Sequence, residues 1–215
     1  MITLSKRLKL QKIKIKKRTI MKTLKTLSLL IVLSLFSFTN PSSTYVLDVG
    51  HTHVGFGVER FLVGEVEGRF NEFSADITME GEDYSTLTLN ATIDVNSLDS
   101  NNKTRDGHLK GKMWLDAENH SEINFKSTSV EKGSDGKYTM NGKMTIKGVT
   151  KDISFPIEIL GPFQDPTKKT TIGVKADFSL NRFDYGLRFN KKLDNGSFFI
   201  GDIVKIKLRA LAYKA

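Results

Sequence analysis

Hydrophobic and polar residues alternate with a period of two over most of the chain after residue 44. The clearest case is Leu87–Val95, where five apolar side chains share one face and polar side chains fill the other. This alternation is typical of β-strands, whose successive side chains point to opposite faces. It predicts strands at 54–58, 66–79, 87–95, 122–131, 137–147, 153–159, 172–180 and 204–210.

The connections between these strands are short and rich in turn-forming residues. Glycine, aspartate and proline gather at 80–83, 132–136, 147–150 and 161–166, which favours antiparallel neighbours. The segment Ser100–Met113 differs, because basic and apolar residues recur there every three or four positions. We expect one short helix in it, capped by Asp99, Ser100 or Asn101.

Strands with one apolar face must cover that face, which a closed barrel or a two-layer sandwich achieves. Long strands suit a tilted barrel, and glycines relieve crowding where strands bend, here Gly55, Gly57, Gly64 and Gly68. We therefore expect an all-β protein, an eight-stranded antiparallel barrel with one short helix between strands, and keep the sandwich as the alternative. In a regular strand over 66–79, Phe70 and Phe73 would point to opposite faces unless a bulge intervenes.

The N-terminal region, 1–43, reads as an extension with a signal peptide. Leu27–Phe38 contains no charge, follows Lys22 and Lys25, and precedes a polar stretch, the pattern of an export signal. A run of this length is short for a bilayer core of about 30 Å, so a permanent membrane helix is the weaker interpretation. Met21 is a more ordinary start for such a signal than Met1. We expect a periplasmic or secreted protein whose folded domain spans 44–215.

Charge and cysteine content narrow the function classes. Ten of the 33 basic residues and no acidic residue lie in 1–43, which leaves 23 basic against 24 acidic residues in 44–215. The formal net charge of +9 therefore comes from the N-terminal region, and the balanced charge of 44–215 disfavours a broad basic face for nucleic acid on the folded domain. The absence of cysteine from the sequence excludes disulfides, thiolate metal sites and thiol nucleophiles.

Catalytic and metal-binding patterns are weak. The sequence contains no G-x-S-x-G, H-E-x-x-H, phosphate-binding or dinucleotide-binding motif, so we expect neither an enzyme nor a cofactor. His51 and His53 would share one face of a strand, but a metal needs further ligands. Asp48 would face the other way on a regular strand, so we favour a hydrogen-bonding role for His51 over a metal site.

Six short segments together resemble the YceI family of exported bacterial, lipocalin-like, polyisoprenoid-binding proteins. The resemblance covers about Tyr45–Ala212 and rests on their order and spacing: YVLD (45–48), HTHVGF (51–56), VEGRF (66–70), RDGHL (105–109), MTIKGVT (144–150) and NRFDYG (181–186). The sequence departs from the family pattern at Met113–Asp116 and at Ser121. These departures affect the expected shape of the cavity more than the assignment to the family.

The resemblance implies a lipocalin-like barrel around an apolar tunnel that holds a polyprenyl chain, such as a polyprenyl phosphate or an isoprenoid quinone. The 14 Phe and 6 Met residues can supply smooth, adaptable walls. The inward stripes predict the lining residues Val54, Phe56, Val58, Phe70, Leu89, Ile93, Phe125, Met144, Ile157 and Phe178. The alternative for each is a solid core.

Arg105, His108 and Arg182 are the candidates for contact with a ligand head group, since an arginine fork suits phosphate or a quinone carbonyl. The structural alternative ties Arg105 and His108 to the barrel and pairs Arg182 with Asp184 or another carboxylate.

The leading hypothesis is a carrier that sequesters or transports an amphipathic isoprenoid lipid. The rivals are an exported structural or stress-response protein with a filled barrel, and a hydrolase or isomerase acting on a captured lipid. The expected partner is the lipid and not nucleic acid. Transient membrane contact and a homodimer stay open.

Overall fold

The computed structural model describes residues 12, 14, 16, 17 and 41–215, of which Pro41–Ala215 form one compact unit. The predicted signal peptide at Leu27–Phe38 lies outside the described residues. None of the helices that the structure describes is long and apolar enough to cross a membrane.

Residues 41–215 contain eleven strands that belong to one antiparallel sheet. The strands are β1 (Ser42–Leu47), β2 (His53–Arg60), β3 (Gly64–Phe70), β4 (Phe73–Glu80), β5 (Thr88–Asp94), β6 (Leu98–Asp99), β7 (Glu122–Lys132), β8 (Tyr138–Ile146), β9 (Val149–Gln164), β10 (Thr170–Asn181) and β11 (Ile200–Lys214). Four 3₁₀ turns and one helix connect them: η1 (Val49–His51), η2 (Tyr84–Thr86), η3 (Val95–Ser97), α2 (Lys103–Lys110) and η4 (Arg182–Tyr185).

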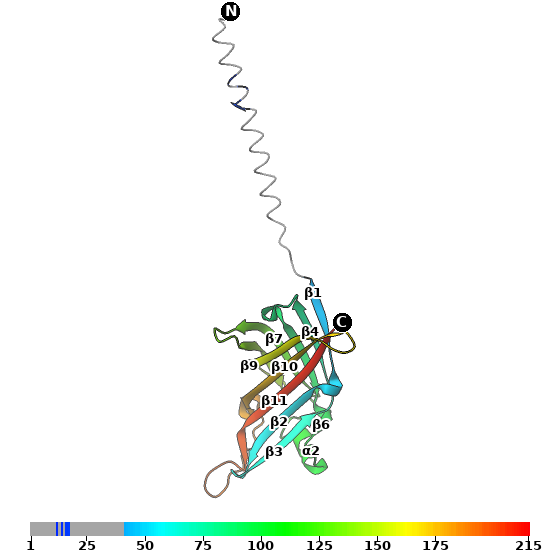
Figure 1. The fold of residues 1–215 in the computed structure, drawn as a ribbon. Coiled ribbons are helices and arrows are strands. Elements are labelled where there is room, and N and C mark those ends of the chain that lie inside the picture. Colours follow the sequence, from blue (N-terminus) through cyan, green and yellow to red (C-terminus); the bar gives the residue numbers. More distant parts are fainter. Residues whose placement is uncertain (1–11, 13, 15, 18–40) are drawn as a thin grey trace, which may run out of the picture. The chain divides into compact units, whose positions relative to one another are not determined.

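Eight of these strands close into a barrel. They follow the order β1-β4-β5-β7-β8-β9-β10-β11, and β11 returns to pair with β1 from Tyr45–Lys214 to Leu47–Ala212. The N-terminal part of β11 pairs instead with β2, which continues to β3 and β6. β1 and the C-terminus thus lie toward one end of the barrel, and α2 and β6 toward the other (Figure 1). The expected eight-stranded antiparallel barrel is confirmed.

The sheet divides into two branches at β11, which the sequence pattern did not predict. In one branch β11 pairs with β1, β1 with β4, and β4 with β5. In the other branch β11 pairs with β2, β2 with β3, and β3 with β6. The expectation of one strand over 66–79 was wrong, because β3 ends at Phe70 and β4 starts at Phe73. This break lets both phenylalanines point inward. β1, where serine and threonine are frequent, was not predicted as a strand.

An aspartate or asparagine starts each of the four 3₁₀ turns, because its side chain competes with the ladder for backbone N–H groups. In η3, for example, Asp94 Oδ1 accepts a hydrogen bond from Asn96 N at 2.8 Å. The four capping residues are Asp48, Asp83, Asp94 and Asn181.

The predicted helix is present but shorter than expected, and its cap differs. Asn102 caps α2, with its side-chain oxygen accepting from Arg105 N at 3.0 Å. Asp99, Ser100 and Asn101 are not the cap; Ser100 instead donates to Asp106 from its backbone N at 2.8 Å and also from its hydroxyl.

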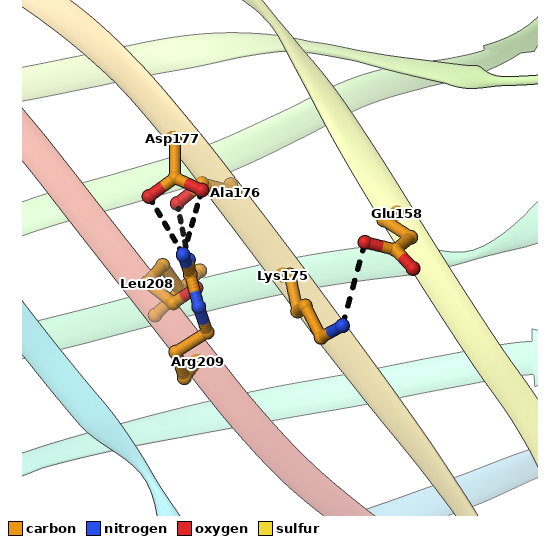
Figure 2. Close-up of polar contacts among 6 residues, drawn as sticks. All are labelled: Glu158, Lys175, Ala176, Asp177, Leu208 and Arg209. Carbon is orange, nitrogen blue, oxygen red and sulfur yellow. Dashed lines mark hydrogen bonds and ion pairs between the residues drawn. The ribbon is translucent and has the colours of Figure 1, made fainter.

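The outer face of the barrel is polar and crossed by ion pairs between strands (Figure 2). Arg209 on β11 donates to both carboxylate oxygens of Asp177 on β10, at 2.7 and 2.9 Å. Lys175 on β10 lies 3.5 Å from Glu158 on β9. Since side chains alternate across a strand, the residues between these charged positions face inward.

The inward side chains form two hydrophobic clusters. The first lies in the closed, eight-stranded part and contains Tyr45, Met79, Phe125, Met140, Phe155 and Ile172 among others. The second lies nearer α2 and contains Phe70, Val95, Leu98, Leu115, Ile123 and Tyr185 among others. Met144 packs against both clusters, so one flexible side chain links the two parts of the interior.

Gly142 on β8 provides a test of the close packing inside the barrel. A Cβ there would lie 2.5 Å from Phe125 Cζ and 2.6 Å from the Lys126 carbonyl oxygen. We expect Gly142→Ala to lower the free energy of unfolding by about 1–3 kcal/mol, as measured by urea denaturation. The control is Gly107→Ala in α2, where a Cβ meets nothing within 4 Å; it should be neutral or stabilising by up to about 1 kcal/mol. Equal stability of the two variants would contradict this packing.

Candidate functional site

Two small apolar cavities lie inside the barrel. The first, which we call the barrel cavity, has a volume of about 130 Å³ and is bordered by inward residues of all eight barrel strands and of β2. The second, the arginine cavity, has a volume of about 120 Å³ and lies nearer α2. Ile206 on β11 borders both cavities. The interior is therefore divided into neighbouring spaces, and is neither one wide bore nor wholly filled.

A larger pocket, the mouth pocket, opens to solvent beside α2. Its volume is about 720 Å³, and residues of α2, of the loop after α2, of β2 and of β11 line it. It shares Phe56, Val58, Leu109 and Trp114 with the arginine cavity. The pockets thus follow one another from the solvent through the mouth pocket and the arginine cavity to the barrel cavity.

Aromatic rings occupy much of the space around the barrel cavity. Phe155 and Phe178 stack with ring centroids 4.2 Å apart, and Phe125 lies 5.5 Å from Phe155. Phe125 and Phe178 border the cavity together with Met140 and Met144. The cavity walls therefore combine rigid rings with methionines, which adapt their shape easily.

All predicted lining residues except Ile157 border one of the two inner cavities. Val54, Leu89, Ile93, Phe125, Met144 and Phe178 border the barrel cavity, whereas Phe56, Val58 and Phe70 border the arginine cavity. Ile157 is only 4% exposed and packs in the first cluster, but it borders none of these cavities. The inward direction of this side chain was predicted correctly. The alternation of apolar residues alone does not distinguish a side chain in the solid core from one that lines a cavity.

The mouth also contains aromatic residues that the sequence pattern did not identify. Trp114 stacks on Phe189 at 5.3 Å between ring centroids, and Phe199 lies 6.4 Å from Phe189. Trp114 and Phe189 lie outside regular strands, where no period fixes the direction of a side chain. Trp114 is the single tryptophan of the chain, a signal that could have drawn attention to this loop.

Arg182, at the start of η4, borders the arginine cavity and is 3% exposed. Its guanidinium donates hydrogen bonds to the carbonyl oxygens of Leu187 at 2.6 Å, Gly201 at 2.8 Å and Ile200 at 3.1 Å. The expected ion pair with Asp184 or another carboxylate was wrong, because backbone carbonyls of residues 187, 200 and 201 accept the hydrogen bonds of the guanidinium. Burial lowers the pKa of Arg182, while the charge of Asp202 opposes that shift.

Tyr185, also in η4, borders the same cavity and is 2% exposed. Its hydroxyl is buried and has no hydrogen-bond partner among the described residues. Burial, with a contribution from the charge of Asp184, raises the pKa of Tyr185 to about 12. The hydroxyl therefore stays protonated at neutral pH and is a hydrogen-bond donor.

Arg105 and His108 on α2 both line the mouth pocket. Arg105 donates to Ser100, from Nε to the hydroxyl oxygen at 2.8 Å and from Nη2 to the carbonyl oxygen at 2.6 Å. These contacts fit the structural alternative, in which the arginine ties the helix to the barrel.

Outside the barrel, a groove of about 790 Å³ has mainly charged and polar walls from β2, β3, β10 and β11. Lys205 and Glu65 form an ion pair across it at 3.1 Å. His53 borders this groove. His51 Nδ1 lies 2.9 Å from Asp48 Oδ2, so His51 has the expected hydrogen-bonding role. The expectation that Asp48 faces away from His51 was wrong, because the chain forms the turn η1 between them. Within residues 41–215, no three His, Asp or Glu side chains are grouped to hold a metal.

Comparisons with known proteins agree with this architecture. The family model described as YceI-like domain matches residues 45–212. A UPF0312 protein of Staphylococcus aureus strain N315 is 31% identical over 171 residues, which cover 78% of this chain and 96% of that protein.

Solved structures show the same fold. The Campylobacter jejuni YceI protein has a TM-score of 0.64 at 28% identity and covers 79% of this chain and 96% of its own. Burkholderia cenocepacia BcnA has a TM-score of 0.67 at 23% identity, covering 77% and 98% respectively. A structure described as a polyisoprenoid binding domain from Saccharophagus degradans has a TM-score of 0.61 at 15% identity, covering 80% and 99%.

The three carbonyl contacts of Arg182 predict a large structural cost for its removal. We expect Arg182→Ala to lower the free energy of unfolding by about 3 kcal/mol or more, because it leaves buried acceptors without their charged donor. The matched control is Arg209→Ala on the outer face, where the partner Asp177 is 64% exposed and the cost should be about 1 kcal/mol or less. Equal losses in chemical denaturation would show that Arg182 does not hold η4 in place.

Proposed function

The chain belongs to the YceI-like domain family, and on that premise we propose that it is a carrier of an amphipathic isoprenoid lipid, such as a polyprenyl phosphate or an isoprenoid quinone. The observation that supports this most directly is the series of apolar spaces from the mouth pocket into the barrel. An eight-stranded barrel is wide enough for one slim ligand. The lipid chain lies inside, shielded from water.

The hydrophobic effect supplies the driving force. Burial of a methylene group contributes about 0.8 kcal/mol, so several isoprene units provide on the order of 10 kcal/mol before ordering costs. The inner cavities, at about 120 and 130 Å³, are each smaller than the roughly 300–1,000 Å³ of typical ligand pockets. Entry of a long chain therefore requires side chains to move, and Met144, between the two clusters, is suited to do so.

The structural neighbour from Saccharophagus degradans supports the ligand class. It is described as a polyisoprenoid binding domain, and at 15% identity it shares the fold with this chain. Because the two proteins share the barrel fold and the inner cavities of this chain have apolar walls, we expect a ligand of the same kind, an elongated hydrocarbon chain.

We propose binding without catalysis. Of the residues that border the two inner cavities, none is a histidine, aspartate or glutamate, the usual general bases. A hydrolase or isomerase would need such a group at the captured lipid.

The second candidate function is that of an exported structural or stress-response protein that acts through its outer surface. The small inner volumes and the Phe125–Phe155–Phe178 contacts favour it. It predicts that the barrel stays empty of lipid even at saturating concentration.

Filling the barrel cavity separates the two candidates. Ala91 on β5 borders this cavity, so Ala91→Leu should reduce binding of a prenyl lipid at least tenfold, by excluding the chain. Native mass spectrometry of protein loaded with the lipid measures the bound mass. The control, Asn90→Leu, places the same side chain at the neighbouring exposed position and should leave binding unchanged. Absence of any lipid mass on the wild-type protein would support the filled barrel.

We further propose that the protein is exported to the periplasm or secreted, and that it takes up lipid at an anionic membrane surface. At the β2–β3 turn, Leu62 is 51% and Val63 is 92% exposed. The neighbouring loop is tied to this turn, because Phe199 lies 4.4 Å from Phe61 between ring centroids. That loop, 188–199, carries three basic residues against one aspartate. Apolar tips flanked by basic residues suit anionic lipid headgroups.

Vesicle binding tests this surface. We expect Val63→Asp to weaken binding to phosphatidylglycerol vesicles about tenfold, since it removes an apolar anchor and adds a negative charge. The control is Phe163→Asp, which changes another exposed apolar residue, 66% exposed, near the β11 end opposite the turn. Equal effects of the two variants in a sedimentation assay would contradict docking through the β2–β3 turn.

A further inference from the structure

The loop 188–199 contains a tight, exposed turn in which an asparagine is followed by a glycine. Leu193 N donates to Ser197 O at 2.8 Å, and Gly196 N donates to Leu193 O at 2.9 Å. Asn195 and Gly196, at the tip of the turn, are both exposed. Gly196 has a φ of 83°, which a glycine adopts without strain. The turn therefore presents the peptide bond between these two residues to solvent.

An exposed asparagine that precedes a glycine is prone to deamidation, because glycine has no side chain to block the attack of its backbone nitrogen. This nitrogen forms a bond to the side-chain carbonyl carbon of the asparagine, and Nδ2 leaves as ammonia with the proton of the attacking nitrogen. Water then opens the cyclic imide at either carbonyl, which gives aspartate or isoaspartate. The net reaction converts one amide and one water into one carboxylate and one ammonium ion, so it needs no oxidant and no further reactant.

The side chain of Asn195 is held in a position that favours this attack. Its Oδ1 accepts a hydrogen bond from Ser197 N at 3.0 Å, so the amide group is folded back along its own backbone. The same hydrogen bond polarises the carbonyl and makes its carbon more electrophilic. The N–H of Gly196 must first leave Leu193 O, but local opening of an exposed turn costs little free energy.

The chain contains a second asparagine–glycine pair, whose surroundings are the opposite. Asn141 and Gly142 lie within β8, which pairs with β7 on one side and with β9 on the other. Asn141 Nδ2 donates to Glu131 Oε1 at 2.8 Å and to Ser129 Oγ at 3.0 Å, and Gly142 is buried. Attack at Asn141 requires these strands to separate, which costs nearly the free energy of global unfolding.

We infer that Asn195 is a site of spontaneous deamidation, and that the new carboxylate weakens binding of the loop 188–199 to an anionic membrane. This loop carries three basic residues and one aspartate, so one more carboxylate halves its formal net charge. Loss of one unit of positive charge near an anionic surface weakens binding about fivefold. The effect on membrane binding rests on the proposed uptake of lipid at such a surface, whereas the deamidation does not.

The lysines of the loop lie close to the turn. Lys192 and Phe198 pair across the two arms of the loop, directly before and after the turn. Lys192 Nζ lies 5.6 Å from the ring centroid of Phe198, and Lys191 Nζ lies 5.3 Å from that of Phe199. The new charge therefore arises in the same small hairpin as these two ammonium groups, and it reduces their attraction for anionic headgroups.

Incubation of the purified protein at neutral pH tests the modification site. Peptide mass mapping follows the amide-to-acid mass change at each asparagine, and the released ammonium is measured separately. We expect Asn195 to react at least about tenfold faster than Asn141. Gly196→Ala should slow the reaction at Asn195 about tenfold, because a methyl group hinders the attack, whereas Gly107→Ala, at an exposed glycine of α2, should not alter it. Equal rates at the two asparagines, or no reaction at Asn195, would overturn the site.

Vesicle sedimentation tests the effect on membrane binding. Asn195→Asp, which reproduces the aspartate product, should weaken binding to phosphatidylglycerol vesicles about fivefold. The matched control is Asn90→Asp, which adds the same charge at an exposed position on β5 and should change binding less than about twofold. Equal effects of the two variants would overturn the effect on the membrane and leave the deamidation site standing. A wild-type protein that binds no vesicles would overturn the proposed membrane uptake and this effect with it, while the released ammonium would still decide the modification site.

Discussion

Backbone pairing between β1 and β11 is the constraint on which the interior depends. Three residue pairs, from Tyr45–Lys214 to Leu47–Ala212, join the first strand to the last and leave the closed part without free edges. Closure encloses the inward side chains and places the charged ladder of Arg209 and Asp177 outside (Figure 2). The same apolar residues therefore stabilise the fold and form the walls available to a hydrocarbon chain.

Polar groups enter this interior where the strand pattern gives way to η4. Asn181 starts the turn by accepting from Phe183 N at 2.9 Å, and the chain then carries Arg182 and Tyr185 to the arginine cavity. Arg182 is held by carbonyl oxygens, so its position is fixed before any ligand arrives. Basic side chains such as Arg105 and His108 line the mouth pocket, whereas the walls of the two inner cavities are apolar, so an amphipathic guest has one favoured direction.

The sequence predicted the features that arise from local alternation, and missed those that depend on turns and loops. Leu89 and Ile93 were placed inward correctly, because the period of two decides the face. The opposite phases of Phe70 and Phe73 indicated an irregularity between them, but polar residues at 71–72 fit a bulge in one strand as well as a turn between two. Trp114 and Phe189 follow no period, and the partners of Arg182 are backbone carbonyls, which carry no sequence signal.

A crystal structure of the protein soaked with a long-chain prenylquinone tests the central claim most directly. The account predicts continuous electron density from the mouth pocket past Ile206 into the barrel cavity, with Met144 displaced. Unchanged inner cavities at saturating ligand, or density confined to the outer groove between β3 and β10, would contradict it.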